Sequence, residues 1–221
     1  MKNPRNLFAV VLMSALALSG CSNKTEDSIV IGMECNYAPF NWTATSASDY
    51  TLPIFNDAGK YADGYDIQFA KRLSSELNKK VTIMKLEWDN LIISLNNKTI
   101  DAVIAGMTDT EERRQSIDFT DEYYRSELVL ITKKAVSDEY DGKQLDASDM
   151  TEVLNGKNIE SQRGTVTDDV IETFKTNYGA IHSVAVDTFA KAAADVHTGA
   201  AFAMTAELPV AQSIVKNYSD L

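Results

Sequence analysis

Cysteine and histidine are scarce in this chain, which has only Cys21, Cys35, His182 and His197 among its 221 residues. Because these residues do not cluster at the spacings of metal-binding motifs, we expect neither a metal site nor a bound cofactor. Basic residues are also few, since 21 Lys and Arg stand against 32 Asp and Glu and give a formal net charge of −11. This balance argues against nucleic acid and other polyanionic partners.

Long apolar runs are absent after Cys21, so the sequence predicts no membrane-spanning helix in the rest of the chain. The one long run covers 12 residues, 7–18, and follows Lys2 and Arg5. It is too short for a permanent span and is typical of a signal-peptide core. It ends in the sequence Leu18-Ser19-Gly20-Cys21.

This ending resembles the lipobox of bacterial lipoproteins, in which small residues admit the signal peptidase and the cysteine thiol receives a diacylglycerol. The resemblance implies that 1–20 is a signal peptide and that Cys21 carries a lipid anchor with palmitate. It also implies that 21–27 is a polar tether holding the protein outside the cytoplasmic membrane. An ordinary secretory signal that contains a cysteine is the alternative. With Cys21 lipidated, Cys35 has no partner for an internal disulfide, so the core must hold the fold.

Short strand-like runs alternate with amphipathic helical patterns, which predicts an α/β fold with mostly parallel sheets. The expected strands are 28–33, 81–84, 102–105, 127–132, 156–159, one near Ile181, and 200–204. One helix is expected to begin at Gly64, and further helices are expected at 91–95, 166–175, 187–197 and 207–216. In the helix that begins at Gly64, one stripe carries Tyr65, Phe69, Leu73 and Leu77. The polar segment 43–62 is expected to form a surface hairpin or an Ω-type loop.

Residues 86–124 read LEWDNLIISLNNKTIDAVIAGMTDTEERRQSIDFTDEYY. This stretch resembles the amino-acid-binding proteins of ABC transporters (bacterial extracellular solute-binding proteins, family 3), with their Trp-Asp-x-Leu-Ile helix, "IDA" strand, "GMTxTxxR" turn and "DFTxPYY" segment. Residues 36–40, 64–67, 156–165 and 206–211 are similar to four further segments of that family, in the same order.

The resemblance implies two α/β lobes with a ligand cleft between them, the type II periplasmic-binding-protein fold. Lobe 1 would be 28–126, the first hinge strand 127–130 and lobe 2 131–221. The protein would be a monomeric non-enzyme that captures a free amino acid and delivers it to an ABC permease with a cytoplasmic ATPase. Family members continue further, so we expect a C-terminally truncated chain that lacks the second crossover and the end of the first lobe.

The family motif places Arg113 at the ligand α-carboxylate, which its planar fork can hold through two hydrogen bonds. Thr108 offers a hydroxyl and a backbone N–H, and the N–H groups of Thr165 and Val166, at a helix start, can meet the same carboxylate. The alternative for Arg113 is a surface helix residue, a role that suits Arg114 better.

For the ligand ammonium, the resemblance offers the carbonyl of Gly106, where the backbone can approach closely, and the carboxylate of Glu207. Glu207 can also be read as an acid favoured by a helix N-terminus, and both roles can hold at once.

Tyr37 and Trp88 match positions that pack on the ligand side chain, where an aromatic pair suits an apolar chain, a guanidinium or an ammonium. Glu34 matches a position that is acidic in relatives selecting cationic side chains, which favours arginine or another basic amino acid. A solvated acid at a strand end is the alternative for Glu34. Gln162 is expected to line the second-lobe face.

Two other classes of function share this fold or its ligands. Extracytoplasmic enzymes, including dehydratases and cell-wall lyases, need a general acid or base in the cleft, and Glu34 is the only candidate. A sensory receptor domain would need a transmembrane helix and a signalling module, which the sequence does not show.

Overall fold

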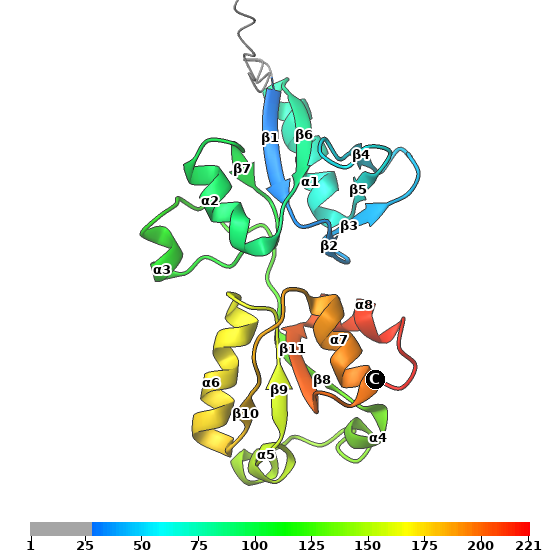
Figure 1. Cartoon of the computed structure of the whole chain (residues 1–221), viewed down its shortest axis with the longest axis vertical. Helices are drawn as coiled ribbons and strands as arrows, with labels where there is room; N and C mark the ends of the chain where they lie inside the picture. The colour runs from blue at the N-terminus through cyan, green and yellow to red at the C-terminus, as the bar shows by residue number, and fades with distance from the viewer. Residues whose placement is uncertain (1–27) are drawn as a thin grey trace, which may run out of the picture.

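A computed structural model of the protein describes residues 28–221, which form two lobes stacked along the long axis (Figure 1). The predictions of a signal peptide, a tether and a lipidated Cys21 concern residues 1–27 and lie outside the described residues. Within 28–221, no helix combines the length and the apolar character that a membrane span requires.

The first lobe is built on a parallel sheet in the order β6-β1-β7, as the alternating pattern predicts. Its elements are β1 (Ser28–Met33), β6 (Lys80–Lys85), β7 (Ala102–Val103), α1 (Tyr65–Leu77), the 3-10 helix η1 (Trp88–Asn90), α2 (Leu91–Asn96) and α3 (Glu111–Arg114). The central strand β1 is apolar and buried at its carboxyl end, and α1 and α2 pack on the sheet. Strand β7 is shorter than predicted and only half-buried, because it forms the edge of this sheet.

A second, antiparallel sheet extends the first lobe in the order β2-β3-β5-β4. Its strands are β2 (Asn36–Tyr37), β3 (Asn41–Ala44), β4 (Leu52–Pro53) and β5 (Tyr61–Asp63). Because β3 and β5 pair antiparallel across the polar segment between them, the prediction of a surface hairpin in 43–62 is confirmed.

Helix α1 begins where predicted, but the face that it buries differs from its apolar stripe. Tyr65, Phe69 and Leu77 are exposed, whereas Asp66, Ile67 and Ala70 are buried. The exposed rings of Tyr65 and Phe69 each stack on Tyr123, and Tyr124 meets Tyr65 edge to face. Periodicity located the helix correctly and its buried face wrongly.

The second lobe contains a four-stranded sheet in the order β10-β9-β11-β8, parallel except for the antiparallel pair of β11 and β8. Its elements are β8 (Leu128–Thr132), β9 (Asn158–Glu160), β10 (Ile181–His182), β11 (Ala203–Glu207), α4 (Lys134–Ser137), α5 (Ala147–Leu154), α6 (Val166–Tyr178), α7 (Phe189–Thr198) and α8 (Leu208–Val215). The charged stretch 133–152, for which the sequence predicts no element, contains α4 and most of α5.

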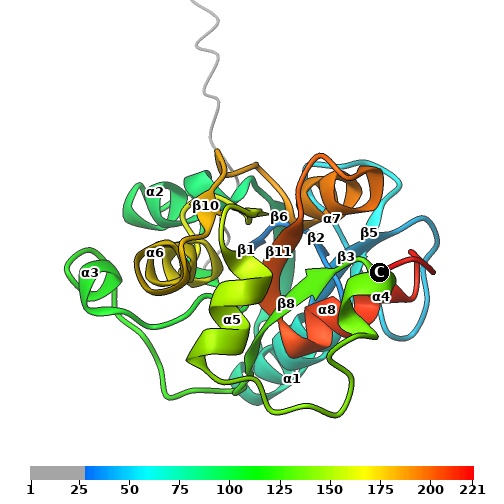
Figure 2. The same ribbon diagram turned by 90° about the horizontal axis from the view of Figure 1, so that it is seen from below.

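Helices cover both faces of the second sheet, with α5 and α6 on one side and α7 and α8 on the other (Figure 2). Strand β8 pairs along its whole length with β11, so the segment that joins the lobes ends before Leu128. The predicted hinge strand 127–130 therefore overlaps a strand of the second lobe.

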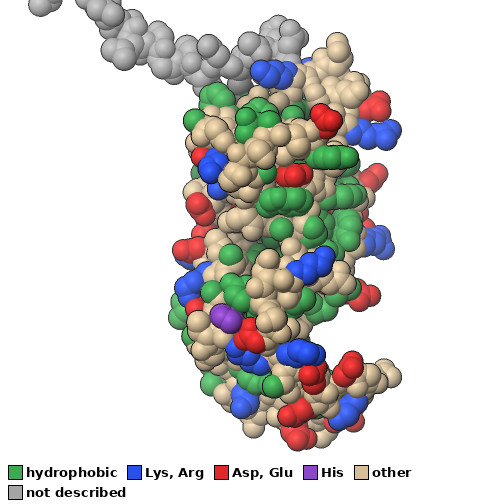
Figure 3. All heavy atoms as spheres, turned by 90° about the vertical axis from the view of Figure 1, so that its right-hand side faces the viewer, with side chains coloured by type: hydrophobic (Ala, Val, Ile, Leu, Met, Phe, Trp, Pro, Cys, Tyr) green, Lys and Arg blue, Asp and Glu red, His purple; other side chains and the backbone are tan. Residues whose placement is uncertain are grey.

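Within the described part of the chain, the core consists of three clusters, and one of them spans both lobes. The first lies inside lobe 1 and the third inside lobe 2, between α5, β9 and α6. The second joins Tyr37 and Phe40 of the first lobe to Phe189, Met204 and Val210 of the second. On the side where β4, β5 and α7 lie, apolar side chains are interspersed with charged ones of both signs (Figure 3).

Candidate binding pocket between the lobes

A narrow pocket lies between the lobes, and its cavity of about 10 Å³ has room for about one water molecule in this arrangement of the lobes. Its walls comprise Glu34, Tyr37, Trp88, Ala105, Gly106, Thr108, Arg113, Gln162, Thr165, Val166, Phe189 and Glu207. All ten residues that the sequence nominates for ligand binding are among them, although they come from segments far apart in the chain. Their role in binding stays a prediction; their convergence on one pocket is a property of the fold.

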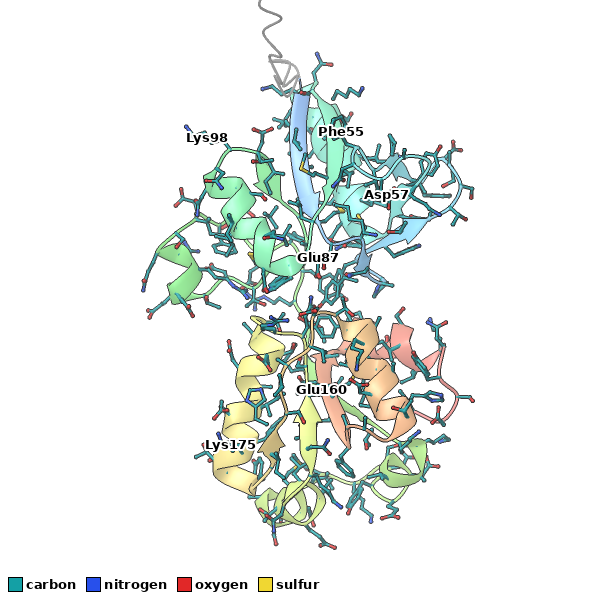
Figure 4. The ribbon with its side chains drawn as sticks, in the orientation of Figure 1. Phe55, Asp57, Glu87, Lys98, Glu160 and Lys175 are labelled. Atoms are coloured by element: carbon teal, nitrogen blue, oxygen red, sulfur yellow. The ribbon has the colours of Figure 1, made fainter. Side chains whose placement is uncertain are left out.

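Glu34 lies between β1 and β2 and is only 3% exposed, which excludes the alternative of a solvated acid. Burial raises the pKa of its carboxyl from 4.5 to about 7, the hydrogen bond from Gln162 opposes this shift, and the charges of Glu87 and Asp89 add to it. A buried carboxylate of this kind is stabilised by a cation. Glu87 marks the edge of the first lobe that faces the second (Figure 4).

Arg113 lies in the last turn of α3 and faces the other lobe, unlike Arg114, which pairs with Asp109 at the surface. One Nη of Arg113 donates to the Thr108 carbonyl at 2.6 Å and the other to the Gly164 carbonyl at 3.1 Å. Burial lowers the pKa of its guanidinium, and nearby acids oppose that change. The guanidinium remains charged, because even a lowered pKa of this group lies far above neutrality.

Gly106 lies in the turn after strand β7 and has a φ of 62°, in the left-handed region that favours glycine. A Cβ at this position would lie 3.0 Å from Cε1 of Tyr37, so a side chain would crowd the pocket wall. The turn is held by the Gly106 N–H, which donates to the Tyr123 hydroxyl at 3.0 Å. The backbone therefore passes close to the pocket without a side chain in between.

The second-lobe wall contains the N-terminus of α6, as predicted. Thr165 is the N-cap residue, and its hydroxyl accepts from the Asp168 N–H at 3.3 Å. The first N–H groups of such a helix attract anions. Just before it, Gln162 is 1% exposed, and its Nε2 donates to the Asp187 carbonyl at 2.9 Å.

Glu207 is the last residue of β11 and the N-cap position of α8, where its side chain makes no capping hydrogen bond. It instead accepts a hydrogen bond from the Tyr37 hydroxyl, across the lobes. Burial raises the pKa of this carboxyl, while the bonds from Tyr37 and from its own backbone N–H oppose the shift. The side chain is thus committed to the pocket and not to its helix.

Direct hydrogen bonds cross between the lobes at the pocket. Trp88 Nε1 donates to the Gly164 carbonyl at 2.9 Å, which Arg113 also reaches. Gln162 Nε2 donates to Glu34 Oε1 at 2.7 Å. The Arg113 guanidinium carbon lies 5.4 Å from the centroid of the Trp88 ring, so a cation and an aromatic face meet at the same edge.

Two buried oxygens of the pocket residues, Gln162 Oε1 and Glu207 Oε2, have no hydrogen-bond partner among the described residues. A buried acceptor without a donor is unfavourable, so these atoms favour a ligand with N–H groups. In 28–221, no group of His, Cys, Asp and Glu has an arrangement that could hold a metal ion.

Sequence reasoning missed two residues of the pocket wall, Ala105 and Phe189. Ala105 directly precedes Gly106 and could have been found from that neighbour alone. Phe189 begins α7, and its ring centroid lies 5.1 Å from that of Tyr37. No signal in the sequence links these two rings, because their contact depends on how the lobes meet.

The pocket resembles those expected of amino-acid-binding proteins, and comparisons with known proteins agree. The arginine-binding extracellular protein ArtP of Bacillus subtilis is 26% identical over 177 residues, which are 78% of this chain and 60% of that protein. The structure of AbpA, an amino acid ABC transporter substrate-binding protein of Streptococcus pneumoniae bound to L-arginine, superimposes with a TM-score of 0.70 and 25% identity, over 88% of this chain and 73% of that one. The ancestral amino acid-binding protein AncCDT-1, a precursor of cyclohexadienyl dehydratase, gives a TM-score of 0.70 and 27% identity, over 86% and 75% of the two chains.

These relatives are binding proteins by name, and the two-lobed α/β architecture is that of type II periplasmic binding proteins, as predicted. The matched part of this chain spans 60%, 52% and 54% of the lengths of three curated relatives. A family model matches residues 29–198, which cover the first lobe, most of the second lobe and nine of the ten predicted pocket residues. The chain belongs to the bacterial extracellular solute-binding proteins, family 3.

Proposed function

We propose that the protein captures a free amino acid in the pocket between its lobes. The observation that carries this proposal is the pattern of charge around the pocket, with Arg113 on one side and Glu207 and Glu34 on others. A zwitterion that leaves water needs a partner for each of its charges, since an unpaired buried charge costs several kcal/mol. Arg113 and the N-terminus of α6 would hold the α-carboxylate, and Glu207 with the Gly106 carbonyl would hold the ammonium.

The ligand side chain is proposed to be basic. With Arg113 and Glu207 paired to the zwitterion, the buried carboxylate of Glu34 remains, so the three charges together amount to −1 and suit a ligand of net charge +1. Glu34 and the free Oε1 of Gln162 lie on opposite lobes and together can accept several N–H bonds, as a guanidinium or an ammonium requires. Tyr37, Trp88 and Phe189 supply aromatic surface for its aliphatic stem.

The further steps of the proposal concern the whole protein. It would be tethered outside the cytoplasmic membrane by a lipid on Cys21 and would deliver its ligand, as a monomer, to an ABC permease with a cytoplasmic ATPase. Membership of an extracellular solute-binding family supports this placement. Growth in labelled palmitate, followed by detection of label in the wild type and in Cys21→Ser, tests the anchor.

A titration of the purified chain with each common amino acid, followed by calorimetry, tests the binding proposal. Arginine or lysine should bind with micromolar or tighter affinity, and glutamate should not bind. Binding of glutamate in preference to arginine would refute the basic ligand, while the absence of binding by any amino acid would refute capture itself. If mass spectrometry shows that the protein chemically converts a compound that it binds, the result would instead support an enzyme that uses Glu34 as its general acid or base.

A further inference from the structure

Asp66, in the first turn of α1, lies outside the pocket and is 0% exposed. Its two carboxylate oxygens hold two separate partners: Asn41 Nδ2 donates to Oδ2 at 2.8 Å and the Tyr123 hydroxyl donates to Oδ1 at 3.1 Å. Burial raises the pKa of this carboxyl to about 6, and the two hydrogen bonds oppose the shift. A buried acid with both oxygens bonded to side chains links segments that are distant in sequence.

Asp66 does not serve its own helix. Gly64 is the N-cap of α1, where no side chain caps the backbone, and the N–H groups of Tyr65 and Asp66 already donate to the carbonyls of Pro39 and Phe40. The carboxylate therefore adds nothing to the hydrogen bonding of the α1 backbone, and its burial requires another explanation.

The first partner leads to the loop of Glu34. Asn41 Oδ1 accepts the Cys35 N–H at 2.8 Å, and the Cys35 carbonyl accepts from the Thr43 hydroxyl at 2.8 Å. Cys35 has a φ of 56°, a left-handed conformation that a residue with a side chain adopts only when its surroundings hold it. The turn that directs the chain at Glu34 is therefore fixed by Asn41, and Asn41 is fixed by Asp66.

The second partner leads to the other first-lobe wall. The Tyr123 hydroxyl donates to Asp66 and accepts the N–H of Gly106, the pocket glycine with positive φ. The Gly106 amide is thus oriented by a chain of two hydrogen bonds that ends on the same carboxylate.

We propose that Asp66 is a positioning residue that, through Asn41 and Tyr123, sets the geometry of the Glu34 and Gly106 loops for ligand binding. This inference rests on the proposed function, since it explains how the first-lobe groups for the ligand ammonium and side chain are held in register. Because neither Asp66 nor Asn41 lines the pocket, they act through the residues that do.

The test compares two tyrosine variants that each remove one hydroxyl. Tyr123→Phe removes the link between Asp66 and Gly106. Tyr65→Phe is the matched control, because its hydroxyl donates at 3.2 Å to the backbone carbonyl of Tyr123 and reaches neither Asp66 nor Gly106. Amide hydrogen exchange, the dissociation constant for arginine and the melting temperature are measured for both variants, for Asp66→Asn and for the wild type.

In Tyr123→Phe we expect faster exchange of the Gly106 amide and about fivefold weaker arginine binding, the change that corresponds to one lost hydrogen bond. Asp66→Asn keeps only one oxygen that can accept a hydrogen bond, whereas Asn41 and Tyr123 each need one. We therefore expect faster exchange of the Cys35 or the Gly106 amide and weaker arginine binding. Tyr65→Phe should bind as the wild type does. Unchanged exchange in Tyr123→Phe, or faster exchange with unaltered affinity, would overturn the proposal. If the wild type binds no amino acid, the proposed function fails, and exchange alone still decides whether Asp66 positions the loops.

Discussion

Affinity for a basic amino acid is expected to rise with pH up to about neutrality, because Glu34 must be ionised to pair with a cation. Its carboxyl is buried and titrates with a pKa of about 7, raised by burial from 4.5. Below that pKa the Glu34 carboxyl is mostly protonated, so binding of a cation there has to release a proton. A neutral ligand such as glutamine makes no such demand on Glu34.

The magnitude follows from the linkage between proton and ligand. Each pH unit below about 7 should weaken arginine binding by about tenfold, since one pKa unit corresponds to about 1.4 kcal/mol. Stability of the ligand-free protein should change in the opposite direction. Between pH 4.5 and about 7 the folded chain holds a proton on Glu34 that the unfolded chain has lost, so the free energy of unfolding falls as pH rises through this window.

Calorimetric titrations of the wild type and of Glu34→Gln with arginine and with glutamine, at several pH values between about 5 and 8, check this linkage. Repeating them in buffers of different ionisation enthalpy counts the protons released. Glu207 and Asp66 also have raised pKa values, but both remain in Glu34→Gln, so the difference between the two proteins isolates Glu34. Parallel pH profiles for arginine in both proteins would refute the reasoning.

Three further substitutions have defined outcomes. Arg113→Ala should weaken every amino acid ligand by about 100-fold, since it leaves the α-carboxylate without its cation; calorimetry with arginine and glutamine checks that both lose equally. Gly106→Ala should lower the unfolding free energy by about 1 kcal/mol, because φ is positive there and the new Cβ would crowd Tyr37; urea titration measures it. Burial lowers the pKa of His182, but hydrogen bonds to Glu172 and to a second carboxylate of α6 outweigh this and raise the pKa. The stabilisation is fully present below the unfolded-state pKa and is lost as pH rises through the folded value, so melting temperatures should show that His182→Asn destabilises the protein more at about pH 6 than at about pH 8.

The pocket residues could be nominated from sequence because they lie in or beside short segments that resemble motifs of a known family. Arg113 lies in the short segment that the structure forms as α3, and Thr165 is the N-cap of α6 directly after Gly164. Such motifs are short and contiguous, so the resemblance can be read from a single sequence. The order of strands and helices could be predicted because each element has its own local hydrophobic pattern.

Features set by the packing of distant segments could not be predicted. The stripe of Tyr65, Phe69 and Leu77 indicated a buried face, yet α1 buries Asp66, Ile67 and Ala70. Periodicity reports that a helix has two faces, but the partner that covers one of them is determined elsewhere in the chain.

Asp66 shows most clearly why tertiary contacts decide the role of a residue. In the sequence, an acid in the first turn of a helix is explained by the helix dipole alone, and such an acid is usually exposed. Its partners Asn41 and Tyr123 are 25 and 57 positions away, and the Glu34–Gln162 bond spans 128 positions. Buried polar groups must be hydrogen-bonded, so each of these long-range bonds constrains two loops at once. The pocket is therefore specified at two levels, by the side chains that supply its chemical groups and by buried polar side chains that lie outside its walls.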